Sequence, residues 1–539
     1  MNFSRKEKKI EFQNVELKYR LSFSGEGKNL PLLILLNDSG SGMSFEIPEA
    51  IRQENPVILS LDCNRDSLRK YGWKLTDYHF RKDPVPPVAA LLKLLDSILR
   101  EYPVDFSRLY LAGIAAGGFV CWELMRRRIG LFAGAILVGC GTDLADFSPV
   151  AATPIRLYHG VEDPVVPIRI ARQLYLMLMD IHCDVKLNEI PGSDRDALLH
   201  VSGTSEPMQW LFGLRQKIFT SMPLPENFRI VELDAFGFTA KILPDAAGNI
   251  FSLRHKTTGT ALLREPHRPE ELFHTPERFG IPPLFPPNRI EDGSFLFDGK
   301  ICRLPINQPV QNLHLHGIAV SKPWQLIRKD ENFAELKFTF DSDSPEYDGF
   351  PFACEIVRRY ELTEKGLRDI VTVRNTGDRT MPLGLGFHTA FPAENATVRV
   401  GTGEYEFEIH KTTFLPTGHC LPWNEFDPRN AFDPFKKIVS FHSEAGYLQS
   451  VGGCEFHGAE LVYPTGTLRY ITDEKFGFWY TWNAGGLNNF LCLEPVSWMS
   501  NALNLPLPAS RSGVRKLAPG EESCFVSLLE FEPGNTSEE

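Results

Sequence analysis

Two patterns of apolar and polar positions divide this chain. From residue 8 to residue 216, short apolar runs alternate with segments of helical spacing, which lie at residues 88–100 and 118–125. The apolar runs, each expected to form a buried strand, are residues 32–36, 57–61, 109–112, 133–140 and 155–160. Buried strands that alternate with helices predict a parallel sheet covered by helices on both faces.

The second pattern begins after residues 219–228, which contain two prolines, lack periodicity and are expected to form a linker. Beyond them, short stretches of alternating apolar and polar residues are separated by Gly, Pro, Asn and Asp; examples are residues 230–233, 295–297, 335–340, 370–373 and 405–409. This pattern is typical of a large antiparallel β-sandwich. The sequence therefore predicts two domains, residues 1–218 and 229–535, joined by that linker.

Composition narrows the classes of protein to consider. A chain of 539 residues with 43% hydrophobic and 23% charged residues is an ordinary globular protein, too long for a single core. Its net charge of −11, with residues 126–128 as its one conspicuous basic run, argues against binding nucleic acid. The N-terminus does not resemble a signal peptide, and no apolar run is long enough to span a membrane. The ten cysteines are scattered, which favours reduced thiols in a cytoplasmic protein over disulfides or a zinc site.

Residues 113–117, Gly-Ile-Ala-Ala-Gly, lie between an expected strand and an expected helix. This is the context in which G-x-S-x-G presents a nucleophilic serine, but Ala115 holds the central position and has no nucleophilic atom. The first 215 residues or so resemble a degenerate α/β-hydrolase domain of the esterase and peptidase-like type. The resemblance places Asp163 at the position of the acid and Arg195 at that of the histidine, where arginine cannot act as a base.

Three alternatives remain open in this first domain. A shift in register would make His200 the base, although a structural role is expected for it. Ser39 and Ser41 are substitute nucleophiles in principle, but turn residues beside glycines are the simpler interpretation. Asp163 and Arg195 are also candidates for an ion pair with each other.

Four motifs in the second half occur in the order found in the aldose 1-epimerase (galactose mutarotase) family, which this half resembles. They are residues 280–300, which include Asn288 and Arg289; residues 312–317, Asn-Leu-His-Leu-His-Gly; residues 381–391, which end a glycine-rich strand at His388; and residues 490–496 around Glu494. The resemblance implies that Glu494 is the general base and His388 the general acid. It also implies that Asn288, Arg289 and His316, together with the nearby His314, bind the sugar.

One family feature is missing. Many members carry a sugar-binding aspartate between the catalytic histidine and glutamate, and residues 447–458 contain none; Asp433, Glu455 and His457 are the other candidates. The aromatic residues Phe476, Phe478, Trp479, Tyr480 and Trp482 include possible stacking platforms for a sugar, but core packing is the favoured interpretation.

Acid–base interconversion of sugar anomers needs no metal and no cofactor, so we expect neither. The leading hypothesis is a mutarotase acting on an aldose, either neutral or phosphorylated, with an inactive hydrolase-like domain attached. The alternatives are a non-catalytic carbohydrate-binding or regulatory protein and, last, an esterase with an unusual nucleophile.

Overall fold

The computed structural model describes residues 6–38, 44–63, 80, 83–143, 150–216, 221–400, 405–410, 413–422, 436–437, 446–449, 457–483 and 489–534. The chain forms two compact units, Met1–Ile218 and Phe219–Glu539. None of the described helices is long and apolar enough to cross a membrane.

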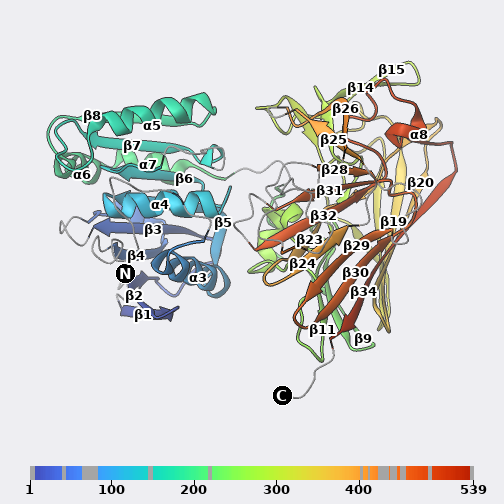
Figure 1. The fold of residues 1–539 in the computed structure, drawn as a ribbon, viewed down its shortest axis with the longest axis horizontal. Coiled ribbons are helices and arrows are strands. Elements are labelled where there is room, and N and C mark those ends of the chain that lie inside the picture. Colours follow the sequence, from blue (N-terminus) through green and yellow to red (C-terminus); the bar gives the residue numbers. More distant parts are fainter. Residues whose placement is uncertain are drawn as a thin grey trace. The chain divides into compact units, whose positions relative to one another are not determined.

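The N-terminal unit is built on one sheet with the strand order β1-β2-β4-β3-β5-β6-β7-β8 (Figure 1). The strands from β4 to β8 run parallel to one another, whereas β2 is antiparallel to both β1 and β4. The strands are β1 Lys6–Phe12, β2 Val15–Ser22, β3 Leu30–Asp38, β4 Val57–Cys63, β5 Val104–Ile114, β6 Gly134–Val138, β7 Ile155–Gly160 and β8 Val185–Ile190. The helices are α1 Glu49–Gln53, α3 Pro86–Glu101, α4 Ala116–Arg127, α5 Ile168–Asp180, α6 Asp194–Gly203 and α7 Glu206–Gly213.

Alternation along β3 explains why helices cover both faces of this sheet. Leu32, Ile34 and Leu36 pack with residues of α3, α4 and α5, whereas Leu33 and Leu35 pack with residues of α1, α6 and α7. Successive side chains of a strand point to opposite faces, so a continuous apolar run supplies two cores.

The predicted parallel sheet is antiparallel at one edge. β1 and β2 form a hairpin whose turn residues, Gln13 and Asn14, both have positive φ, at 49° and 61°. Such turns suit the twist of two antiparallel strands. The half-exposed, polar-rich β2 lacks the apolar run that identified the buried strands, and the sheet is therefore mixed.

The C-terminal unit contains two large antiparallel sheets, a three-stranded antiparallel sheet of order β11-β10-β9 and several short pairs (Figure 1). One large sheet has the order β12-β22-β32-β31-β28-β25-β26, with β23 also paired to β32; the other has the order β17-β18-β19-β20-β34-β30-β29-β24-β27. β19 and β20 alternate between buried and more exposed residues, and their buried residues join a large apolar core. The predicted antiparallel β architecture is confirmed.

The C-terminal strands have the following bounds: β9 Val231–Ala235, β10 Phe238–Leu243, β11 Asn249–His255, β12 Pro283–Leu284, β13 Arg289–Glu291, β14 Ser294–Phe297, β15 Lys300–Arg303, β16 Leu313–Leu315, β17 Gln325–Lys329, β18 Phe333–Phe340, β19 Cys354–Thr363, β20 Gly366–Asn375, β21 Met381–Leu383, β22 Gly386–Phe387, β23 Thr389–Pro392, β24 Thr397–Val400, β25 Tyr405–Ile409, β26 Pro416–Pro422, β27 Lys436–Lys437, β28 Gly446–Gln449, β29 Gly458–Tyr463, β30 Gly466–Thr472, β31 Phe478–Trp482, β32 Phe490–Val496, β33 Arg515–Leu517 and β34 Glu522–Pro533. The helical segments are η2 Pro269–Phe273, η3 Pro276–Arg278 and α8 Ala509–Ser512.

Candidate functional site

Strand pairing brings Glu494 and His388 together. Glu494 lies within β32, and His388 lies between β22 and β23, both of which pair with β32. His388 Nε2 is 3.2 Å from Glu494 Oε1, and the two side chains are only 5% and 4% exposed. The His388 backbone N–H donates to the Pro282 carbonyl at 3.0 Å, which fixes the position from which the imidazole projects. A carboxylate and an imidazole thus form a close pair inside the domain.

The second motif adds His316 to this pair. The His316 ring meets the His388 ring edge to face, with 5.0 Å between their centroids. His316 has a φ of 67°, and its backbone N–H donates to the carbonyl of Asn288, which has a φ of 64°. The next residue, Gly317, has a φ of 72°, and a Cβ there would collide with the Phe285 carbonyl. A tight turn at these positive-φ residues therefore directs the imidazole toward His388.

Arg289 is the cationic member of the cluster. It begins β13, where it pairs with Leu315 of β16, and its Nη1 donates to Asn288 Oδ1 at 3.2 Å. Its positive charge opposes the rise that burial causes in the pKa of the Glu494 carboxyl, and adds to the fall that burial causes in the pKa of His388. His314 is close to His316 but is bound to the backbone, because its Nδ1 donates to the Pro305 carbonyl at 2.7 Å.

Burial is the largest influence on the pKa values of Glu494 and His388. Desolvation raises the pKa of Glu494 to about 8, an effect that the charge of Arg289 opposes. Desolvation, together with the positive charges of Arg289 and Arg278, lowers the pKa of His388 to about 3. At neutral pH the pair accordingly holds one proton, located on the carboxyl group, and is uncharged. Such a pair can accept one proton and donate another within the same site.

The N-terminal unit presents a separate feature, the turn that carries Ala115 between β5 and α4. Ala115 has φ 46° and ψ −113°, a strained conformation at a strand-to-helix turn. A Cβ at Gly117 would collide with the Leu36 carbonyl, and a Cβ at Gly113 would lie 2.6 Å from Cys121 Sγ. Both glycines are therefore required by close packing, and the expected turn is present with a methyl group at its tip.

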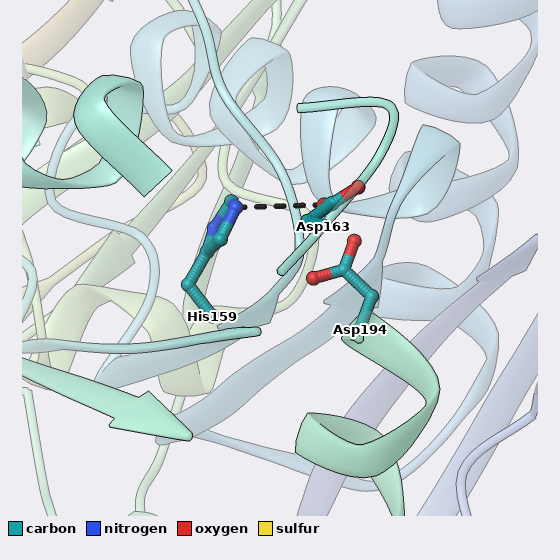
Figure 2. Close-up of side chains that lie close together, drawn as sticks. All are labelled: His159, Asp163 and Asp194. Carbon is teal, nitrogen blue, oxygen red and sulfur yellow. Dashed lines mark ion pairs between the residues drawn. The ribbon is translucent and has the colours of Figure 1, made fainter. Parts of the chain in front are cut away.

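The side chain of Asp163 is buried, but the ion pair expected with Arg195 is not among those of the described residues. Asp163 Oδ2 lies 3.4 Å from His159 Nε2, and its Oδ1 accepts hydrogen bonds from the backbone N–H groups of Val165 and Val166. Arg195 is exposed, whereas its neighbour Asp194 is buried and faces Asp163 (Figure 2). His200 is exposed and its ring lies near that of Tyr158. Ser39 and Ser41 lie outside the described residues.

Comparison with known protein families identifies the family of the C-terminal half. Residues 229–528 match the aldose 1-epimerase family model, more than half of the chain. The chain belongs to the aldose 1-epimerase family. The resemblance inferred from the four motifs is confirmed.

Two curated relatives of the aldose 1-epimerase domain are uncharacterized proteins of Escherichia coli strain K12. YihR is 28% identical over 181 residues, which are 33% of this chain and 54% of YihR, so only about half of that relative's length is covered. YphB is 22% identical over 257 residues, 46% of this chain and 83% of YphB. A solved galactose mutarotase-like protein from Clostridium acetobutylicum is 26% identical, with a TM-score of 0.52 over 57% of this chain and 100% of its own.

Two residues near Glu494 and His388 were not identified as site residues from the sequence. The Trp482 ring meets the His388 ring edge to face, with 5.6 Å between their centroids, and Trp482 is only partly buried. The other four residues of the aromatic cluster, Phe476, Phe478, Trp479 and Tyr480, are core residues, which is the interpretation that the sequence favoured. Arg278, in η3, contributes to the low pKa of His388 and lies 5.9 Å from the Trp482 ring. Trp482 belonged to a recognised cluster, but Arg278 has no sequence signal, because it lies in a short irregular segment.

Of the three candidates for the missing sugar-binding aspartate, the structure describes His457. Asp433 and Glu455 lie outside the described residues. His457 Nδ1 lies 2.9 Å from the Thr472 carbonyl and 3.0 Å from its hydroxyl, which gives this histidine a structural role.

Proposed function

We propose that the C-terminal domain interconverts the anomers of an aldose, with Glu494 and His388 as its acid–base pair. The observation that carries the proposal is the 3.2 Å contact between these two side chains, beside His316 and Arg289. The test is NMR exchange spectroscopy between the α and β anomers of a panel of aldoses. The absence of any acceleration over buffer across the panel would contradict the proposal.

The reaction uses the single dissociable proton that Glu494 and His388 share. The Glu494 carboxylate removes the proton of the anomeric hydroxyl while protonated His388 donates a proton to the ring oxygen. The bond between C1 and the ring oxygen breaks, the aldehyde rotates about its bond to C2, and the reverse transfers close the ring on the other face. The free site favours the proton on Glu494; hydrogen bonds from sugar hydroxyls and the Arg289 guanidinium would stabilise the carboxylate and shift that proton to His388.

This assignment predicts the pH dependence of the rate. The pair loses its single proton as the pH rises through about 8, the pKa of Glu494, and gains a second as the pH falls through about 3, the pKa of His388. We expect kcat/KM to fall on the alkaline side with a midpoint near pH 8. Polarimetry corrected for buffer catalysis would measure this, and a rate that stays flat to pH 10 would contradict the assignment.

One comparison of substrates tests whether the sugar carries a phosphate group. Arg289 is suited to donate hydrogen bonds to sugar hydroxyls, and equally to a phosphate group. Neutral and phosphorylated forms of the same aldose should therefore be compared with the wild-type protein and with Arg289→Met. A phosphate contact predicts that the variant loses its preference for the phosphorylated form, whereas a hydroxyl contact predicts a similar loss for both.

A non-catalytic carbohydrate-binding protein is the second candidate, because residues 447–458 lack the family's sugar-binding aspartate. Saturable sugar binding by calorimetry without anomer exchange would favour this alternative.

For the N-terminal domain, an inactive hydrolase-like scaffold accounts for the turn at Ala115 and for the run of parallel strands from β4 to β8. Ala115→Ser should fold normally, since it adds one oxygen at a position that already has positive φ. We expect no ester hydrolysis, because arginine at position 195 cannot accept the serine proton. Release of nitrophenol from p-nitrophenyl acetate is the measurement. Activity in Ala115→Ser that disappears in Ala115→Ser/His200→Ala would contradict this and identify His200 as the base.

A further inference from the structure

Trp482 differs from the other four aromatic residues of its cluster, because it alone of the five is only partly buried. Its ring meets the His388 ring with 5.6 Å between their centroids. We propose that Trp482 is a substrate-binding residue whose indole stacks against the C–H face of a pyranose ring and selects sugars without an axial hydroxyl on that face. This inference rests on the proposed function, since it seats the sugar beside Glu494 and His388.

Strand pairing places Trp482 on the face of the sheet that carries Glu494. Trp482 pairs with Cys492 and Tyr480 pairs with Glu494, in the antiparallel strands β31 and β32. Paired residues project to the same face of a sheet, and so do residues two positions apart on one strand. The residues between them project to the other face and belong to the large apolar core: Trp479, Leu491 and Leu493. Trp482 and Glu494 therefore both project away from that core.

Two aromatic neighbours hold the indole in place. The centroids of the His388 and Phe490 rings lie 5.6 and 5.5 Å from that of Trp482, at interplanar angles of 76° and 70°. Such edge-to-face contacts between aromatic rings are favourable. Phe490 is buried, and the guanidinium carbon of Arg264 lies 3.8 Å from the centre of its ring. Among the described residues, no ring lies parallel to the indole, so no aromatic side chain is stacked on its face.

A pyranose ring suits such a flat apolar surface. Its hydroxyl groups surround the edge of the ring, whereas C–H groups lie on its faces. The face of an aromatic ring carries negative π density, which attracts the slightly positive hydrogens of C–H groups, and the contact removes apolar surface from water. An axial hydroxyl on the same face would hold the two rings apart and would lose its hydrogen bonds to water. The indole therefore favours sugars whose contacting face is free of axial hydroxyls.

Stacking also supplies sugar contact that the missing aspartate does not. Residues 447–458 lack the sugar-binding aspartate of the family, whereas a contact with the indole needs no charged side chain. His388 has a polar neighbour as well as this apolar one, because the His316 ring lies 5.0 Å from it. The imidazole and Arg289 suit the hydroxyl-bearing edge of a sugar, and the indole suits its C–H face.

Titration of the full chain with D-glucose, D-mannose and D-allose, each as the free sugar and as the 6-phosphate, tests the proposal. Mannose and allose each carry one axial hydroxyl, on opposite faces of the ring, so stacking on one face predicts discrimination against one of them. Calorimetry should show that Trp482→Leu weakens binding of the preferred sugar by about tenfold and abolishes this discrimination. A merely structural role would weaken the binding of all three sugars equally.

Tryptophan fluorescence gives a second measurement. The wild-type emission should change when sugar binds, and Trp482→Phe should lose this change while it keeps most of the affinity, because phenylalanine still offers an aromatic face. The matched control is Trp210→Leu in the N-terminal domain. Trp210 is also partly buried, and the guanidinium carbon of Arg156 lies 4.2 Å from the centre of its ring. This control should bind sugar like the wild type and keep the fluorescence change.

Three results would overturn the proposal: no binding of any of these sugars to the wild-type protein, unchanged binding and discrimination in Trp482→Leu, or an unchanged fluorescence response in Trp482→Phe. If Trp482→Leu fails to fold by circular dichroism, the response of Trp482→Phe still decides. Both measurements report binding and not anomer exchange. A wild-type protein that binds sugar without exchange therefore contradicts the proposed function alone, whereas exchange with unaffected Trp482 variants contradicts the stacking alone.

Discussion

Glu494→Gln should reduce the rate of anomer exchange by about 10²–10⁴-fold, the range expected for loss of a general acid or base. Glutamine keeps the size and hydrogen-bonding shape of the side chain inside β32, a strand in which every residue is buried. Its amide cannot take the proton of the anomeric hydroxyl. The neighbouring His388, with its pKa near 3, is neutral at pH 7 and, without the proton held by Glu494, cannot protonate the ring oxygen.

Exchange spectroscopy at saturating sugar would measure this effect. Glu271→Gln is the matched control, because Glu271 is also buried and its Oε2 is 2.9 Å from a histidine, His267. The control should retain most of the activity, whereas His388→Asn should lose as much as Glu494→Gln. If Glu494→Gln folds, binds sugar and keeps more than about a tenth of the wild-type rate, Glu494 is not the base.

The family motifs named two distant residues that the fold brings into contact, which the periodicity of apolar positions could not have done. Glu494 and His388 are 106 positions apart in the sequence, and only the order of family motifs linked them; the pairing of β22 and β23 with β32 places them in contact. The turns at Asn288 and His316 are local, but the contact between His316 and His388 depends on tertiary packing, which no spacing rule contains.

Apolar runs identified the buried strands of the N-terminal sheet, yet the edge hairpin was missed because β1 and β2 have a polar, half-exposed pattern. The segment around Asp194 shows a different limit of prediction from sequence. The resemblance placed Arg195 at the position of the hydrolase histidine, but the first turn of α6 buries Asp194 and leaves Arg195 exposed. A shift of one residue on a helix turns a side chain by about 100°, so spacing alone cannot decide which side chain faces the sheet.

Asp369→Ala should destabilise the C-terminal domain by about 3–5 kcal/mol, the cost of leaving a buried charge without its partner. Arg358 and Asp369 lie on the paired strands β19 and β20, are 0% and 1% exposed, and form two hydrogen bonds of 3.0 and 2.6 Å. Alanine would leave the Arg358 guanidinium buried with no carboxylate. Calorimetric melting of the full chain would measure the loss in the transition of this domain.

The same substitution should also slow anomer exchange, because the ion pair supports the site. Arg358 Nη1 donates to the Ile281 carbonyl at 2.9 Å, and the next residue, Pro282, accepts the backbone N–H of His388. Glu335→Ala, which removes the partly exposed partner of Arg359, is the matched control and should cost no more than about 1 kcal/mol. If the two substitutions destabilise the domain equally, the buried Arg358–Asp369 pair contributes no more to stability than the partly exposed pair. A large loss of stability in Asp369→Ala with an unchanged exchange rate in the folded protein would separate the pair from the site, because the Ile281–Pro282 segment would then hold His388 without it.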